Sequence, residues 1–192
     1  MDYRLNVHAL LPGSRANGPG SRFVVWLQGC ARRCPGCFNP DTHPFAPRRL
    51  MDPEQLWREV EAHAPRSEGV TVSGGEPLAQ APALAEFLAI VRARSSLSIA
   101  VFTGYELTEI PALPGGRAVL AQTDLLVAGP YRQELHWGKE LRGSSNQQVH
   151  FLTPRYRQQD LAELPSGEVL IGRDGSVIRT GLGGFGQLTS GG

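Results

Sequence analysis

The chain has 192 residues, of which 41% are hydrophobic and 19% are charged, and its formal net charge is +1. This length is enough for one domain with a core of its own, and the composition is that of a globular protein. The balanced charge points to no nucleic acid and no membrane surface as a partner. No apolar run approaches the roughly 18 residues that span a bilayer, and the N-terminus lacks a signal peptide's apolar segment, so we expect a cytoplasmic protein.

Strand-like and helix-like segments alternate along most of the chain. Strand patterns, rich in β-branched and aromatic residues, occupy residues 3–10, 22–28, 69–73, 97–104 and 124–129. Helix patterns occupy residues 54–64, after the cap Asp52 and Pro53, then the segment around Leu84, Phe87, Leu88 and Val91, and residues 117–122. Such alternation predicts parallel βαβ units, with sites gathered at the carboxyl ends of the strands.

The last forty residues have a different pattern. Residues 157–164 predict a helix, and two alternating runs around Asp174 and Gly175 predict a β-hairpin. Residues 181–192 are rich in glycine and predict a flexible tail. We therefore expect a core domain of residues 1–152 and a C-terminal extension of residues 153–192, which either covers a sheet edge or binds a partner.

Three cysteines, Cys30, Cys34 and Cys37, lie within eight positions, and the chain has no other cysteine. Clustered thiols in a reducing compartment bind metal or perform chemistry. A zinc site would need a fourth ligand, for which His43 is the nearest candidate. A [4Fe–4S] cluster held by three thiolates is the better match, because it leaves one iron open for a substrate or cofactor. Gly36 would let the backbone pass close to that cluster.

The C-x3-C-x2-C spacing resembles the signature of radical S-adenosylmethionine enzymes. The segment "SGGEP", with Ser73, Gly74, Gly75 and Glu76, resembles the turn that contacts the methionyl end of the cofactor in that family. The resemblance implies that the cluster reductively cleaves S-adenosylmethionine to a 5′-deoxyadenosyl radical. It also implies that Gly36 and Phe38 border the adenine, and that Thr103 and Tyr105 line the cofactor pocket.

Further motifs narrow the resemblance within that family. "NGPGSR", "GCARRCPGCFNP", "SGGEPL", "FTGY" and "LRGSSNQQVH" occur in this order. Together they resemble the activating enzymes of the anaerobic, glycyl-radical ribonucleotide reductases. This implies an α/β fold in the form of a partial, open (β/α) barrel. It also implies a glycine in a reductase polypeptide as the substrate, and a flavodoxin or ferredoxin as the electron donor.

The chain departs from that pattern at Ala128, Gly129 and Pro130, where such activases often read aspartate–glycine–lysine. The missing aspartate puts a cation site in doubt. Asp124 lies four residues earlier on the same face of the strand, so it could compensate only from a deeper position. We interpret Asn17, Gly18 and Gly20 as residues that shape a turn near the cluster. The polar residues Arg142, Ser144, Asn146 and Gln147 we interpret as structural hydrogen bonding or as partner contacts.

Two alternatives remain open from the sequence. The chain could be a radical enzyme of the same fold that modifies a small molecule or a peptide. The missing aspartate and the added extension are the two features that keep this alternative open. From another class, the chain could be a zinc-binding interaction module without catalysis.

Overall fold

The computed structural model describes residues 3–183, and its centre is a seven-stranded sheet in the order β3-β1-β2-β4-β5-β6-β9. Its strands are β1 (Leu5–Ser14), β2 (Arg22–Leu27), β3 (Arg49–Met51), β4 (Gly69–Gly74), β5 (Ser98–Phe102), β6 (Leu125–Ala128) and β9 (Gln148–Phe151). The four central strands β2, β4, β5 and β6 run parallel, whereas β1, β3 and β9 pair antiparallel to their neighbours. The strands predicted from the sequence are thus confirmed, with β3 and β9 added at the two edges.

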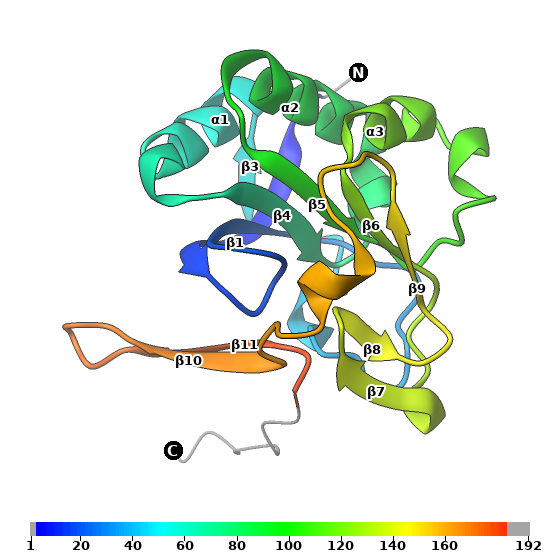
Figure 1. Cartoon of the computed structure of the whole chain (residues 1–192). Coiled ribbons are helices and arrows are strands. Elements are labelled where there is room, and N and C mark those ends of the chain that lie inside the picture. The colour runs from blue at the N-terminus through cyan, green and yellow to red at the C-terminus, as the bar shows by residue number, and fades with distance from the viewer. Residues whose placement is uncertain (1–2, 184–192) are drawn as a thin grey trace.

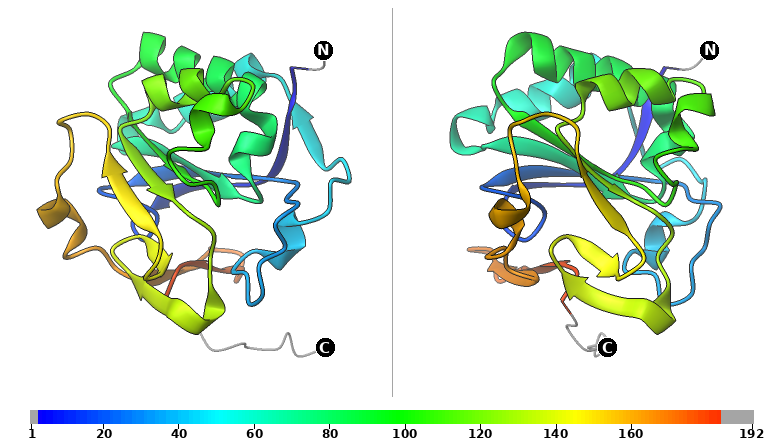
Figure 2. Two further views of the ribbon diagram at one scale, coloured as in Figure 1. Left: turned by 90° about the vertical axis from the view of Figure 1, so that its right-hand side faces the viewer. Right: turned by 45° about the vertical axis from the view of Figure 1, so that its right-hand side comes forward.

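Three helices cover one face of this sheet (Figure 1). They are α1 (Pro53–Glu61), α2 (Ala81–Arg94) and α3 (Gly116–Gln122). Short 3-10 turns lie at Pro40–Thr42, Ala64–Arg66, Pro77–Gln80, Ile110–Ala112, Gln133–Leu135 and Gln158–Leu161. The cysteine loop and the C-terminal residues 158–183 lie on the other side of the sheet (Figure 2).

The main hydrophobic core lies between the helices and the sheet. Alternate residues of the central strands, such as Val72, Val101 and Leu126, point to the helices and are fully buried. They pack with one side of α2, formed by Leu84, Phe87, Leu88 and Val91 as the helical spacing predicts. The strand residues between them form a second, smaller core on the opposite face.

The C-terminal extension packs on that opposite face. Leu161 is buried there, with Tyr156 and Leu164 beside it, against Leu125 and Val127 of β6. The extension thus covers a face of the sheet rather than an edge. Two hairpins lie on the same side: β7 (His136–Lys139) with β8 (Arg142–Ser144), and β10 (Gly167–Ile171) with β11 (Val177–Gly181).

The predicted hairpin around Asp174 and Gly175 is confirmed, but the predicted helix over residues 157–164 is wrong. Only a single 3-10 turn forms, at Gln158–Leu161. The segment carries two leucines, of which Leu161 alone is buried, and Pro165 follows at once. One apolar contact supports a turn but not a longer helix. Of the predicted flexible tail, residues 184–192 lie outside the described residues.

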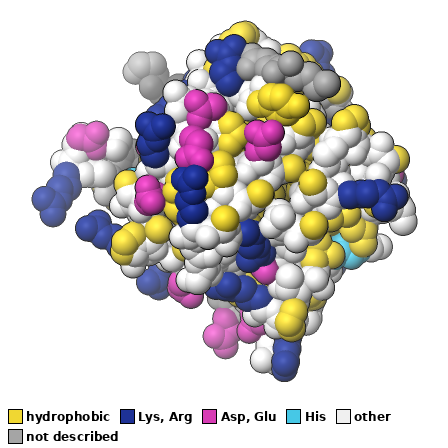
Figure 3. Space-filling view, turned by 90° about the horizontal axis from the view of Figure 1, so that it is seen from above, with side chains coloured by type: hydrophobic (Ala, Val, Ile, Leu, Met, Phe, Trp, Pro, Cys, Tyr) yellow, Lys and Arg dark blue, Asp and Glu magenta, His cyan; other side chains and the backbone are white. Residues whose placement is uncertain are grey.

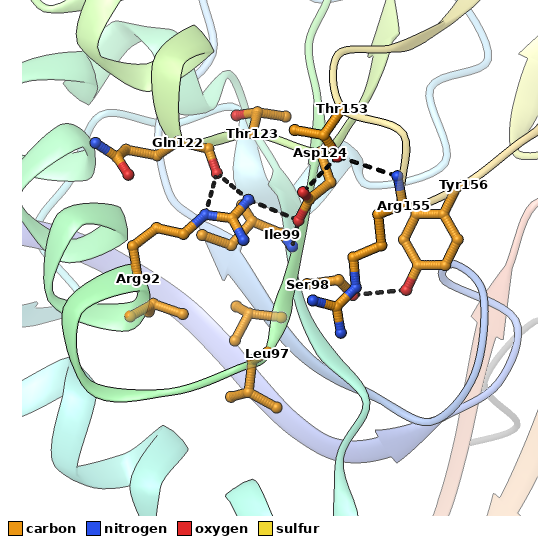
Figure 4. A network of polar contacts seen from close by, with 12 residues as sticks. Arg92, Leu97, Ser98, Ile99, Gln122, Thr123, Asp124, Thr153, Arg155 and Tyr156 are labelled. Carbon is orange, nitrogen blue, oxygen red and sulfur yellow. Dashed lines mark hydrogen bonds and ion pairs between the residues drawn. The ribbon is translucent and has the colours of Figure 1, made fainter.

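A buried polar network joins the extension to the amino-terminal ends of the strands (Figure 4). Asp124 accepts hydrogen bonds from Ile99 N–H (2.8 Å) and Thr153 Oγ1 (2.7 Å), and pairs with Arg92 at 2.6 Å. Tyr156 and Ser98 share a hydrogen bond of 2.7 Å between their hydroxyl groups. The network fixes the start of the extension to β5 and β6.

Basic and acidic side chains are interspersed on the face seen from above the helices (Figure 3). Neither sign dominates there, in keeping with the net charge of +1. Within residues 3–183, no helix has the length and apolar character needed to cross a membrane.

Candidate active site

Three loops at the carboxyl ends of parallel strands meet around one hollow of about 120 Å³. The cysteine loop follows β2, the Ser73–Glu76 turn ends β4, and Phe102–Gly104 ends β5. All three cysteines line this hollow; Cys30 is buried, whereas Cys34 and Cys37 are partly exposed. The convergence predicted from strand order is therefore present.

Backbone hydrogen bonds hold the cysteine loop in a closed bend. Gly29 N–H donates to the carbonyl of Thr42 (2.7 Å), and Cys30 N–H donates to the carbonyl of His43 (3.0 Å). Gln28, at the end of β2, donates from Nε2 to the carbonyl of Pro44 at 2.7 Å. These contacts fix the first cysteine to the returning chain.

The two glycines of the Ser73–Glu76 turn are required by close backbone approach. A Cβ on Gly75 would lie 2.4 Å from the carbonyl oxygen of Gly29, and one on Gly74 would lie 2.5 Å from the nitrogen of Leu27. Gly74 also has a φ of +105°, which favours glycine. Gly75 N–H donates to the carbonyl of Leu27 at 2.8 Å. The turn is thereby pressed against the start of the cysteine loop.

Glu76 is 3% exposed, and its carboxylate bonds within the protein. Oε1 accepts from Thr103 Oγ1 (2.7 Å) and Leu78 N–H (2.9 Å), and Oε2 accepts from Gly104 N–H (2.8 Å). Burial raises the pKa of Glu76, while these hydrogen bonds and the charge of Arg32 oppose the rise. The carboxylate ties the ends of β4 and β5 together at the edge of the hollow.

Arg32, within the cysteine loop, was not singled out from the sequence, although it also lines the hollow. Its guanidinium lies 4.3 Å from the centre of the Tyr105 ring, and its Nε lies 3.8 Å from Oε2 of Glu76. That Nε is buried and has no hydrogen-bond partner. A cation in this position attracts a carboxylate such as that of a methionyl group. The doubled arginine in "CARRC" was the only available signal.

Of the residues predicted to contact the cofactor, most line the hollow. Those that do are Phe38, Ser73, Gly74, Gly75, Glu76 and Thr103. Gly36 and Tyr105 are not among its lining residues. Gly36 lies beside the side chain of Gln133, and Tyr105 lies under Arg32. The role of each side chain toward a cofactor stays a prediction.

Comparison with known proteins fits this geometry. Residues 16–150 match the family model described as a 4Fe-4S single cluster domain. The anaerobic ribonucleoside-triphosphate reductase-activating protein of Escherichia coli (strain K12) is 33% identical over 158 residues, covering 77% of this chain and 99% of that protein. The protein of the same name from enterobacteria phage T4 is 30% identical over 150 residues, covering 76% and 93%.

The chain belongs to this family of reductase-activating proteins. A more distant relative, the pyruvate formate-lyase-activating enzyme of Listeria monocytogenes, is 38% identical over 91 residues, covering 45% of this chain and 37% of that enzyme. The family resemblance expected from the motifs is confirmed.

The donor set suits the cluster that the family model names. Three thiols face one hollow, and thiolate is the usual ligand of iron–sulfur clusters. Burial raises the pKa of Cys37, and the neighbouring Cys34 and Cys30 raise it further. Cys37 therefore has to lose a proton when a metal binds. His43 lines the same hollow with a buried, unpartnered Nε2. Within residues 3–183, however, no group of three or more His, Cys, Asp and Glu is arranged to hold one metal ion, as a closed zinc site requires. A four-iron cluster makes no such demand, because each thiolate binds a different iron.

The missing aspartate at Ala128 is not replaced by another carboxylate on the same strand. Ala128 is fully buried in the core below the helices, where a carboxylate would be desolvated. Asp124 cannot replace it, because its carboxylate is bonded to Ile99, Thr153 and Arg92 at the opposite end of the strand.

The "RGSSNQ" motif braces the hairpin β7–β8 against the end of β6. Gln147 donates from Nε2 to the carbonyl of Gly129 (2.9 Å), and its Oε1 accepts from Gly143 N–H (2.8 Å). Asn146 donates to the carbonyl of Pro130 at 2.8 Å. Since Gly129, Gly143 and Gln147 all line the hollow, the motif shapes one of its walls.

Proposed function

We propose that the chain activates an anaerobic ribonucleoside-triphosphate reductase by radical S-adenosylmethionine chemistry. Cys30, Cys34 and Cys37 would hold a [4Fe–4S] cluster in the hollow. When bound, that cluster supplies the electron that splits S-adenosylmethionine into methionine and a 5′-deoxyadenosyl radical. The radical takes a hydrogen atom from a glycine Cα of the reductase, leaving 5′-deoxyadenosine and a glycyl radical. The electron comes from a flavodoxin or ferredoxin.

The observation that carries this proposal is the meeting of three thiols with the Gly74–Gly75–Glu76 turn in a chain that matches activating proteins over nearly their whole length. The residues of the chain position the reactants. The glycine backbone at the end of β4 leaves room beside the thiols, and Arg32 provides a positive charge for the methionyl carboxylate.

We further propose that the sheet is the partial (β/α) barrel of radical S-adenosylmethionine enzymes. The parallel order β2-β4-β5-β6 and the site at the carboxyl ends of these strands support it. We also propose that residues 1–152 form the conserved core of a cytoplasmic enzyme, to which residues 153–192 are added. The end of the family match at residue 150 supports this boundary.

Anaerobic reconstitution with iron and sulfide tests the proposal. The protein should take up about four irons per chain and turn brown. With S-adenosylmethionine and a reductant it should release 5′-deoxyadenosine, and with the reductase it should give a glycyl-radical signal in electron paramagnetic resonance. Absence of 5′-deoxyadenosine under every reducing condition would contradict the chemistry. Formation of 5′-deoxyadenosine without a glycyl signal would favour a small molecule or peptide as the substrate.

A zinc-binding module is the second candidate, because His43 and the three thiols line the same hollow, although within residues 3–183 no three of these groups are arranged to hold one metal ion. Elemental analysis of protein purified without oxygen separates the two. Zinc that iron and sulfide cannot replace would favour the module, whereas an iron–sulfur chromophore excludes it.

A further inference from the structure

The strand β11 forms one wall of a second hollow of about 480 Å³ that adjoins the active site. Residues 178–183 line this hollow in an unbroken run, whereas no residue of β10 does so. Phe38, Asn39, Ser73, Phe102 and Leu182 line both hollows. A group that enters beside β11 therefore lies next to the hollow that the cysteines line.

The edge of β11 that faces away from β10 has unpaired backbone groups. β11 pairs only with β10 within residues 3–183. The N–H of Leu182 donates to the carbonyl of Ser166 (2.7 Å), and the N–H of Gly172 donates to the carbonyl of Ser176 (2.8 Å). Antiparallel pairs alternate between bonded and non-bonded, so the Val169–Arg179 pair is non-bonded. The N–H and C=O of Arg179 consequently point away from β10, toward the edge that the hollow meets.

Hydrogen bonds attach one end of the hairpin to residues 14–17. Glu168 accepts hydrogen bonds from the hydroxyl of Ser14 and, at 3.0 Å, from the N–H of Arg15. Asn17 donates to Thr180 Oγ1 at 2.8 Å. Gly181 permits this attachment, since a Cβ there would lie 3.1 Å from that of Ala16 and 2.5 Å from the Cα of Gly167.

We propose that the free edge of β11 binds an extended segment of the protein substrate by strand addition, and that this segment leads the reactive glycine to the cysteine hollow. This inference rests on the proposed function. An exposed strand edge is a ready template for another chain, and its backbone bonds require no particular sequence. Arg179 and Leu182 are three positions apart, which corresponds to roughly 10 Å of extended chain, so a segment paired at Arg179 needs only a few more residues to reach the hollow that the cysteines line.

The outer face of the hairpin indicates a protein-sized occupant. Val169, Ile171 and Val177 are 47%, 76% and 54% exposed and lie on one face in register. A small molecule in the hollow would leave this apolar strip in water, whereas a folded partner whose segment enters beside β11 can cover it. The hairpin also lies outside residues 16–150, the part of the chain that matches the family model.

Three variants of the full chain test the strand addition. Arg179→Pro removes the backbone N–H of β11 that points away from β10. Arg179→Thr keeps this N–H and replaces only the arginine side chain. Val169→Pro removes the corresponding outward N–H of β10, on the edge of the hairpin that does not face the hollow. Binding of an anaerobic ribonucleoside-triphosphate reductase to immobilised protein is measured by biolayer interferometry, without S-adenosylmethionine or reductant. We expect Arg179→Pro to raise Kd roughly tenfold, and the other two variants to stay within about twofold of the wild type.

Each outcome decides the inference. If Arg179→Pro and Val169→Pro weaken binding equally, the cause is a distorted hairpin and the inference is overturned. If Arg179→Thr weakens binding as much as Arg179→Pro does, the cause is the arginine side chain and the inference is overturned as well. Light scattering that finds a wild-type dimer, lost in Arg179→Pro, would make β11 a contact between copies of the chain instead. Binding is measured without catalysis, so this experiment is independent of the test of the proposed chemistry. If only Arg179→Pro weakens binding, strand addition is supported even when the wild type forms no 5′-deoxyadenosine. Failure to form 5′-deoxyadenosine contradicts only the proposed chemistry.

Discussion

Each of the three cysteines is expected to be indispensable, because the described residues offer no spare thiol at the hollow. Cys34→Ala leaves two thiolates for a cluster that needs three from the protein. We expect iron to fall from about four per chain to less than about one after reconstitution, with loss of the absorbance near 400 nm. Iron analysis and 5′-deoxyadenosine formation check this, and retention of either at the wild-type level would contradict the ligand assignment.

His43 distinguishes an iron–sulfur site from a zinc site at the level of one side chain. Its backbone carbonyl holds Cys30, but its Nε2 is free within the described contacts. In a Cys3His zinc site, His43→Gln would remove a ligand; in the proposed cluster site it removes none. We expect His43→Gln to keep the backbone bond and to bind iron at the wild-type ratio after reconstitution. Zinc and iron are measured together, with Cys34→Ala as the comparison that loses metal.

The sequence identified the thiols and the Gly-Gly-Glu turn because their spacing is local. It did not indicate that the Glu76 carboxylate joins two strand ends, or that Arg32 lies between Tyr105 and Glu76. Both depend on which loops meet when β2, β4 and β5 pair in parallel. Local patterns carry no such information, so the internal bonds of the site became visible only with the fold.

At the level of elements, helices predicted with local signals were confirmed. Asp52 accepts a hydrogen bond from Gln55 N–H at 2.7 Å, and the Gln55 side chain accepts one from Asp52 N–H, so α1 begins where its cap predicts. The edge strands β3 and β9 were not predicted. Each is short, at three and four residues, and owes its pairing to a neighbour far away in the chain.

The end of β4 is the element on which the shape of the hollow depends most directly. In Gly75→Ala, the new Cβ would meet the Gly29 carbonyl at 2.4 Å, and neither backbone can move without breaking the bonds that join them. We expect a loss of about 2 kcal/mol in the free energy of unfolding and a lower yield of cluster. Urea denaturation and iron analysis measure the two effects.

Ser73→Ala is the matched control for that change. It lies two residues earlier, also lines the hollow, and loses an oxygen without adding a Cβ. It should keep the wild-type stability within about 0.5 kcal/mol. Equal stability of Gly75→Ala and Ser73→Ala would contradict the close approach of β4 to the cysteine loop.

At the scale of the whole molecule, the extension is bound to the core at several distant points. Glu168 contacts Ser14, Thr153 contacts Asp124, and Tyr156 contacts both Ser98 and Arg22. The partners of these contacts are separated by up to 154 positions in the chain. The sequence predicted the hairpin from its turn, but contacts between such distant residues leave no local pattern, so its position beside the active site was not predictable.

Arg22 links the C-terminal extension to the core and contributes to the stability of the whole chain. Its guanidinium is fully buried and, within residues 3–183, forms no ion pair with a carboxylate; burial lowers its pKa. The Tyr156 hydroxyl accepts a hydrogen bond from it at 3.3 Å and shares another with Ser98. Tyr156→Phe removes this bond and the bond to Ser98, whereas the Pro19 carbonyl and the Ser98 hydroxyl still accept from the same Arg22 nitrogen, so we expect a loss of about 1 kcal/mol. Urea unfolding is followed by far-ultraviolet circular dichroism and tryptophan fluorescence, and both midpoints should fall together because the extension and the core unfold as one unit. Tyr3→Phe, a change at a residue 46% exposed, is the control and should leave both midpoints unchanged. A variant in which only one of the two midpoints falls would show that the extension unfolds separately from the core.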